Sequence, residues 1–248
     1  MISFAAIVTL GFLLGMRHAL DPDHVIAVTT IVSRQQTMAR ASLIGTMWGL
    51  GHTMTIFIVG TAIILFNVVI PPRLGLTMEL AVGGMLILLG VLTLTGTVQW
   101  LQRRFTPGLV DQHDASRDLE TENASHSRIN RILKSFGLYN VLRPLVVGIV
   151  HGLAGSAAVA LLVMSTIREP WWAIVYLLLF GFGTVAGMVL ITAAISTPFI
   201  HTARRYSGLN RGMTVASGLL SVGFGLFISY QIGFVDGLFS SHPQWEPR

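Results

Sequence analysis

Cysteine is absent from this sequence, and charged side chains make up only 11% of its 248 residues. The absence of cysteine excludes disulfide bonds, thiolate metal ligands and a thiol-based electron relay. Soluble domains carry roughly 25% charged residues, so this chain has too few of them to cover a surface that faces water. With 52% hydrophobic residues and a mean hydropathy of +0.70, the composition predicts an integral membrane protein.

Motifs that would indicate an enzyme are also missing. The chain has no Gly-x-x-x-x-Gly-Lys-Ser/Thr loop, which excludes ATP hydrolysis by that route, and no His-Glu-x-x-His, which an intramembrane metalloprotease would need. Residues 1–16 contain no Lys or Arg, so we do not expect a cleavable signal peptide. We therefore expect a membrane protein that is not an enzyme and whose first apolar segment remains as a helix.

Six apolar stretches are long enough to cross a bilayer, which takes about 20 residues of helix. They cover residues 4–32, 43–70, 76–101, 145–167, 171–195 and 213–234. We expect three helices in residues 1–101, a polar loop over residues 102–143, and three more helices in residues 144–248. Four tryptophans near the predicted span ends are expected to lie at the membrane interfaces: Trp48, Trp100, Trp171 and Trp172.

The basic residues are distributed unevenly between the two sides of this arrangement. Twelve of the 16 Lys and Arg residues follow the first, third and fifth predicted spans, and three lie on the opposite side. Cytoplasmic loops carry the excess of positive charge, so we expect the long loop in the cytoplasm and both termini outside. The basic excess is explained by this orientation, and we expect no nucleic-acid partner.

The two halves of the chain resemble each other. Three segments recur in order at offsets of 133, 132 and 135 residues: 16–20 with 149–153, 49–53 with 181–184, and Gly83 and Gly90 with Gly218 and Gly225. Because each half has three predicted spans, the halves would sit in the membrane with opposite orientations. Inverted repeats with a binding site at their interface are typical of transporters.

The most unusual part of the sequence is residues 17–24, Arg-His-Ala-Leu-Asp-Pro-Asp-His, which interrupt the first apolar span. Ionisable groups at membrane depth are costly, so they usually face the interior of a bundle and mark a pathway or a site. On an ideal helix, at about 100° per residue, His18, Asp21 and His24 form one stripe. Asp23 is expected to point elsewhere, and the intervening proline to kink the helix.

These residue types predict a site for a divalent cation. Imidazole suits nickel, zinc, copper and iron, and a set of nitrogen and oxygen ligands without sulfur favours Ni²⁺ or Co²⁺ over Cu⁺. We expect Arg17 to pair with Asp21, which would keep the carboxylate ionised. The alternative is a purely structural ion pair between these two residues, with Asp23 capping a helix, but that leaves two membrane histidines unexplained.

Polar residues from other spans could complete the site. His52, in the second span, could complete the coordination sphere, or it could be a neutral buried histidine bonded to a carbonyl. His151 matches His18 in the second half, and Ser156 matches the second aspartate. Both could line the pathway or only pack helices. Thr53 is expected to be a packing or weak pathway group.

Residues 17–25 resemble the signature of the nickel/cobalt transporter family, Arg-His-Ala-x-Asp-Ala-Asp-His-Ile, and residues 51–53 resemble its Gly-His-Ser/Thr motif. The second half is similar to the shorter, urease-accessory-type nickel permeases, because it lacks the acidic, Thr-rich motifs of the eight-span members. The resemblance implies that five residues select and pass Ni²⁺ or Co²⁺: His18, Asp21, Asp23, His24 and His52.

Together these observations predict a six-helix secondary permease in a bacterial cytoplasmic membrane. Its substrate is expected to be Ni²⁺, or Co²⁺, moving inward as cargo rather than held as a cofactor. The metal would be received by a cytoplasmic metallochaperone or by a urease or hydrogenase maturation system. An efflux protein or an anion permease on the same scaffold is the alternative, although the paired aspartates argue against anions. Protons should compete with the metal, so uptake should fall at acid pH.

Overall fold

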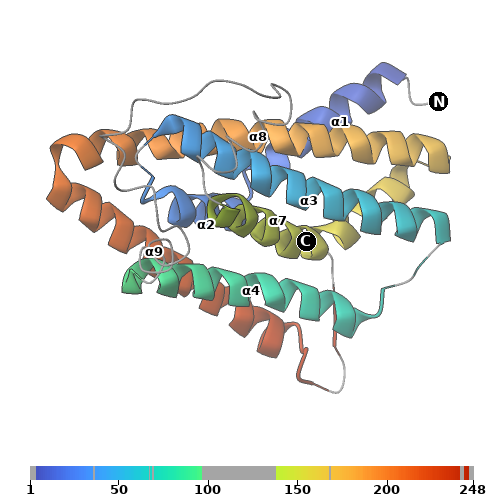
Figure 1. The fold of residues 1–248 in the computed structure, drawn as a ribbon. Helices are drawn as coiled ribbons and strands as arrows, with labels where there is room; N and C mark the ends of the chain where they lie inside the picture. Colours follow the sequence, from blue (N-terminus) through green and yellow to red (C-terminus); the bar gives the residue numbers. More distant parts are fainter. Residues whose placement is uncertain are drawn as a thin grey trace.

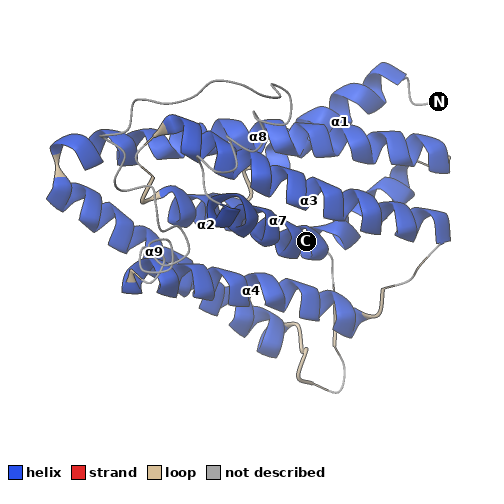
Figure 2. Cartoon of the chain, in the orientation of Figure 1, coloured by secondary structure: helices blue, strands red, loops and turns tan. Residues whose placement is uncertain are grey.

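The computed structural model describes residues 4–35, 37–66, 68, 70–96, 138–167, 169–240 and 243–245. All regular elements in this part of the chain are helical, as expected (Figures 1 and 2). In chain order they are α1 (Phe4–His18), α2 (Pro22–Val32), α3 (Met38–Phe66), α4 (Pro72–Thr95), α7 (Leu138–Thr166), α8 (Pro170–Arg205), α9 (Ser207–Tyr230) and the π-helical turn η1 (Gln231–Val235). The predicted loop over residues 102–143 falls mostly outside the described residues, and its end forms the first turns of α7.

Four helical segments are long and apolar enough to cross a membrane. They are Met38–Phe66, Pro72–Thr95, Pro170–Ala203 and Ser207–Val235, whereas Pro22–Val32 and Val141–Gly155 are shorter apolar helices. Large apolar side chains also lie exposed on their outer faces, among them Ile58, Phe182 and Leu219, each more than half exposed. Such a surface suits lipid rather than water, and the chain is a multi-pass membrane protein.

The first predicted span is broken rather than kinked. Helix α1 ends at His18 and α2 begins at Pro22, with Asp21 in an extended conformation between them (φ −59°, ψ 144°). Proline has no backbone N–H, so it cannot continue the preceding helix. It fits the first position of a new helix, where that N–H would have no partner within the helix. The amides of Leu20 and Asp21 instead close short turns on Arg17 and His18. The break places one helix end and one helix beginning inside the bundle (Figure 1).

Glycines let the helices approach backbone to backbone. Helix α1 packs on α8, and α3 packs on α7. A Cβ atom at Gly15 would collide with the Phe180 carbonyl, and one at Gly148 would collide with the Trp48 carbonyl. The offset of 133 residues takes Gly15 to Gly148, and the offset of 132 residues takes Trp48 to Phe180. The first contact is therefore the counterpart of the second. Further contacts show the same reciprocity: Gly51 against Leu145 and Gly183 against Phe12, and Gly83 against Gly225 and Gly90 against Gly218.

The bundle has two ends that correspond to the two expected membrane sides. Helix α1 begins, and α9 ends, at the end where α3 connects to α4 and α7 connects to α8 (Figure 1). The α2–α3 and α8–α9 connections lie at the other end (Figure 1). Along the bundle, α3 therefore runs toward the first of these ends and α4 away from it, while α8 runs away from that end and α9 toward it (Figure 1).

Candidate metal centre

Four histidines meet where α1, α2, α3 and α7 converge. His18 ends α1, His24 lies in the first turn of α2, and His52 and His151 lie within α3 and α7. The ring centroid of His24 lies 4.7 Å from that of His18, 5.0 Å from that of His52 and 4.1 Å from that of His151. His24, His52 and His151 are at most 2% exposed. Residues from both halves of the chain thus share one buried cluster.

His18 and His52 point ring nitrogens at each other. Their Nε2 atoms are 3.1 Å apart, while Nδ1 of His18 lies 2.7 Å from a carboxylate oxygen of Asp21. Two imidazole nitrogens that each lie about 2.1 Å from one ion, at the angle of about 90° of square-planar or octahedral coordination, are about 3.0 Å apart. The separation of the two Nε2 atoms therefore suits a shared metal ion. The side chain of Asp21 is 48% exposed, so it is less buried than the histidine that it contacts.

Asp23 joins two other histidines, and the expectation that it points away from the site is wrong. One of its oxygens lies 3.0 Å from Nδ1 of His24 and also accepts the His24 backbone N–H at 2.8 Å. The other lies 3.0 Å from Nε2 of His151. The prediction failed because it assumed a continuous helix. The break before Pro22 starts a new helix, so that Asp23 lies in the first turn of α2.

The cluster contains two overlapping groups that could each hold a metal ion. One comprises His18, His24 and His52, and the other comprises Asp23, His24 and His151. In each group, one candidate ligand atom per residue lies within 4.8 Å of the others. Within the described part of the chain, Nε2 of His24, Nδ1 of His52 and Nδ1 of His151 are buried without a hydrogen-bond partner. Buried polar atoms are normally satisfied, so three such nitrogens in one cluster are unusual.

The expected supporting residues lie at the margin of this cluster or beyond it. Arg17 is exposed at the end of α1, and the carboxylate of Asp21 contacts His18 instead. None of the ion pairs found among the described residues includes Arg17. Thr53 donates to the Gly181 carbonyl at 3.1 Å and so joins α3 to α8. Ser156 lies on α7 at a position whose side chain is outside the description.

Two residues at the site were not predicted to belong to it. Trp48, expected at a membrane interface, is fully buried, and its ring lies parallel to that of His24 at 6.1 Å. Glu79 lies on α4 and lines the same cavity as the histidines. It could have been found from the sequence, because it is the single acidic residue in the predicted span 76–101. The burial of Trp48 depends on tertiary packing and carries no comparable sequence signal.

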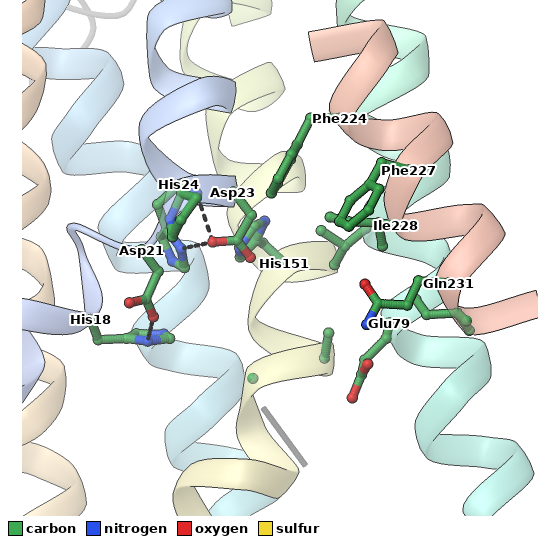
Figure 3. A pocket seen from close by; sticks show the side chains of 15 residues that line it. His18, Asp21, Asp23, His24, Glu79, His151, Phe224, Phe227, Ile228 and Gln231 are labelled. Atoms are coloured by element: carbon green, nitrogen blue, oxygen red, sulfur yellow. Dashed lines mark hydrogen bonds and ion pairs between the residues drawn. The ribbon is translucent and has the colours of Figure 1, made fainter. Parts of the chain in front are cut away.

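A cavity of about 380 Å³ opens beside the cluster. On one side it is lined by His18, Asp21, Asp23, His24 and His151. Figure 3 shows Phe224, Phe227 and Ile228 on the opposite wall, with Glu79 and Gln231 below them. The cavity is therefore polar at the histidine cluster and at Glu79, and mostly apolar between them.

Comparison with known proteins agrees with the sequence motifs. Residues 4–236 match the family described as NicO, high-affinity nickel-transport protein. The chain is also 36% identical over 238 residues to the urease accessory protein UreH of Bacillus sp. (strain TB-90), and the match covers 96% of each chain. No solved protein structure matches the chain.

Proposed function

Because the chain belongs to the nickel/cobalt transporter family of high-affinity nickel-transport proteins, we propose that it is a permease that brings Ni²⁺ into the cytoplasm through its histidine cluster. The family identifies a transporter rather than an enzyme, and nickel is cargo rather than a cofactor. The observation that carries the proposal is the convergence of four histidines and two carboxylates, from four helices of both halves, beside a cavity. Ni²⁺ accepts nitrogen and oxygen ligands of this kind.

The hydrogen bonds suggest which atoms bind the ion. A metal-binding histidine commonly donates its other ring N–H to a carboxylate, which fixes the ring and raises its basicity. His18 and His24 both direct Nδ1 toward an aspartate, Asp21 and Asp23 respectively. This arrangement leaves Nε2 of each ring for the metal, together with Nε2 of His52. For an ion in the first group, we therefore assign the three imidazoles as ligands and the two aspartates as the groups that orient them.

The second group gives the ion a further position on its path. Only His24 belongs to both groups, so an ion bound by His18, His24 and His52 would keep His24 and exchange the other two ligands for Asp23 and His151. Because His151 comes from the second half of the chain, a relative movement of the halves would alter this exchange. The ion would pass between the groups without returning to water.

The reciprocal glycine contacts support the proposal that the two halves are inverted repeats. When the repeat offsets are applied, Gly15 against Phe180 becomes Gly148 against Trp48, as a two-fold relation requires. A transporter of this design binds its substrate at the interface of the repeats, where helices are interrupted. The break between α1 and α2 lies at the cluster and fits that design.

The charge distribution supports an orientation with the polar loop in the cytoplasm and both termini outside. The membrane potential favours inward movement by about 2.3 kcal/mol per charge per 100 mV, and by about twice that for a divalent ion.

The aspartates beside the cavity would repel an anion, which argues against an anion permease. By analogy with the urease accessory relative, we propose that a urease maturation system or a metallochaperone receives the metal. Co²⁺ is the second candidate substrate.

Accumulation of ⁶³Ni²⁺ in cells tests the proposal. Cells that express the chain should accumulate more label than cells with an empty vector, and His24→Ala should abolish the difference at equal membrane abundance. Thr53→Val is the matched control, because Thr53 lies on the same helix as His52 but bonds to α8. Less label than in the empty vector would mean export, and full uptake by His24→Ala would refute the site.

A further inference from the structure

Glu79 is an acidic side chain on a membrane helix that the histidine cluster does not use. It lies about two turns inside α4, is half-buried, and lines the same cavity as His18, Asp23 and His151. An ionisable group inside a membrane helix is costly and usually marks a pathway. Glu79 lies near Gln231, across the cavity from Asp21 and His18 (Figure 3).

The C-terminal segment holds this carboxylate in place. The indole Nε1 of Trp245 donates a hydrogen bond to Oε1 of Glu79 at 2.8 Å. The indole ring also lies against Gly75, one turn earlier on α4, where any side chain would collide with it. The preceding residue, Gln244, donates its backbone N–H to the Asp236 carbonyl at 3.0 Å. The segment thus folds back from the end of α9 onto the beginning of α4, at the end of the bundle where the cavity reaches Glu79.

We propose that Glu79, oriented by Trp245, is a second cation-binding position, at which Ni²⁺ or a similar divalent cation binds before it reaches the histidine cluster. The proposal rests on the proposed function, because the orientation given there places Glu79 on the outer side. A carboxylate at the mouth of a cavity raises the local concentration of cations and the rate of their arrival. Val82, Phe224 and Ile228 offer no ligands between Glu79 and the histidine cluster, so the ion passes directly from the carboxylate to the cluster.

The position of Gln231 fits the same role. It begins η1, the π-helical turn that ends α9, and its side chain lines the cavity beside Glu79 (Figure 3). Turns of π-helix occur often at functional sites because they displace a side chain from the regular helical path. An amide oxygen there could join the carboxylate as a ligand for a hard or intermediate divalent cation.

Transport kinetics test the proposal in cells. Glu79→Gln should raise the KM for ⁶³Ni²⁺ uptake roughly tenfold, at the lower limit of what electrostatic focusing supplies, while the maximal rate stays within about twofold of that of the unaltered chain. Trp245→Phe keeps the ring on Gly75 but removes the N–H, so it should raise KM less. Glu169→Gln is the charge-matched control, because Glu169 is exposed at the start of α8. An unchanged KM in Glu79→Gln, or an equal rise in Glu169→Gln, would overturn the proposal.

A binding measurement decides the proposal independently of transport. Ni²⁺ bound at Glu79 should quench the fluorescence of Trp245. The contribution of Trp245 is the difference in quenching between the unaltered chain and Trp245→Phe, in NiCl₂ titrations of the full chain in detergent. Glu79→Gln should lose this contribution, and Glu169→Gln should keep it. Quenching of Trp245 that persists in Glu79→Gln would refute the second position. Full uptake by His24→Ala would instead refute only the function of the histidine cluster.

Discussion

Asp23→Asn, compared with Asp21→Asn, tests the proposal that the two aspartates orient the histidine ligands. The substitution keeps the size of the side chain but removes its charge and replaces one acceptor oxygen by an amide. Asp23 contacts Nδ1 of His24 and Nε2 of His151, each at 3.0 Å. Among the contacts that the structure describes, the Asp21 carboxylate meets one histidine, at 2.7 Å from Nδ1 of His18, and its side chain is more exposed than that of Asp23. The two aspartates should therefore contribute unequally, although they lie two residues apart.

The expected magnitude follows from these contacts. Loss of a carboxylate that orients a metal-binding histidine costs about 10- to 100-fold in metal affinity, and each factor of ten is about 1.4 kcal/mol. Asp23→Asn affects two histidines at once and should fall near the upper limit. Asp21→Asn affects one histidine and is partly replaced by water, so it should fall near the lower limit. His24→Ala removes a ligand shared by both groups and should weaken binding most.

Calorimetric titration of the full chain in detergent with NiCl₂ measures this order directly. The account predicts that affinity decreases from the unaltered chain through Asp21→Asn and Asp23→Asn to His24→Ala. If Asp21→Asn abolished binding while Asp23→Asn left it intact, Asp21 would be a direct ligand, as the sequence stripe suggested. That result would refute the assignment of the aspartates as orienting groups.

Three further predictions concern packing and protonation. Gly148→Ala should destabilise the chain by about 1–3 kcal/mol in denaturant titrations, because its methyl group meets the Trp48 carbonyl. Gly84→Ala, which meets nothing within 4 Å, should be neutral or stabilising, and equal losses would contradict the packing argument. Thr53→Val should cost about 1 kcal/mol by removing the bond to Gly181, and should leave the Kd for Ni²⁺ unchanged in the same calorimetric assay. Initial uptake should fall at acid pH, because protons compete with the metal for the imidazole nitrogens, and a rise at acid pH would indicate proton coupling instead.

Most of the candidate site could be predicted from the sequence, because its residues are concentrated in one short segment. Charged and imidazole side chains inside an apolar span have few explanations, so His18, Asp21 and His24 could be assigned to one centre without a structure. His52 was included for the same reason. The roles of the aspartates could not be predicted, because they depend on the break before Pro22. A stripe on an ideal helix assumes continuous backbone, and the structure has two helices there.

Other features depend on contacts between distant segments. His151 could have packed helices or lined the pathway, and only the fold brings it within 3.0 Å of Asp23. Trp48 was misplaced because a tryptophan near the end of an apolar stretch resembles an interfacial anchor, whereas glycines at positions such as Gly148 let α7 cover it. The sequence predicts a repeat from a modest pattern of glycines, and this prediction stays a proposal. The reciprocal contacts that support it appear only when the helices are packed.

The most direct test of the account is the flux of ⁶³Ni²⁺ into proteoliposomes that contain the full chain and no other protein. With an inside-negative potential, the account predicts influx that requires His24 and His52 and is unaffected by Thr53→Val. Influx that is equal in the unaltered chain and in His24→Ala, at equal reconstitution, would contradict passage of nickel through the histidine cluster.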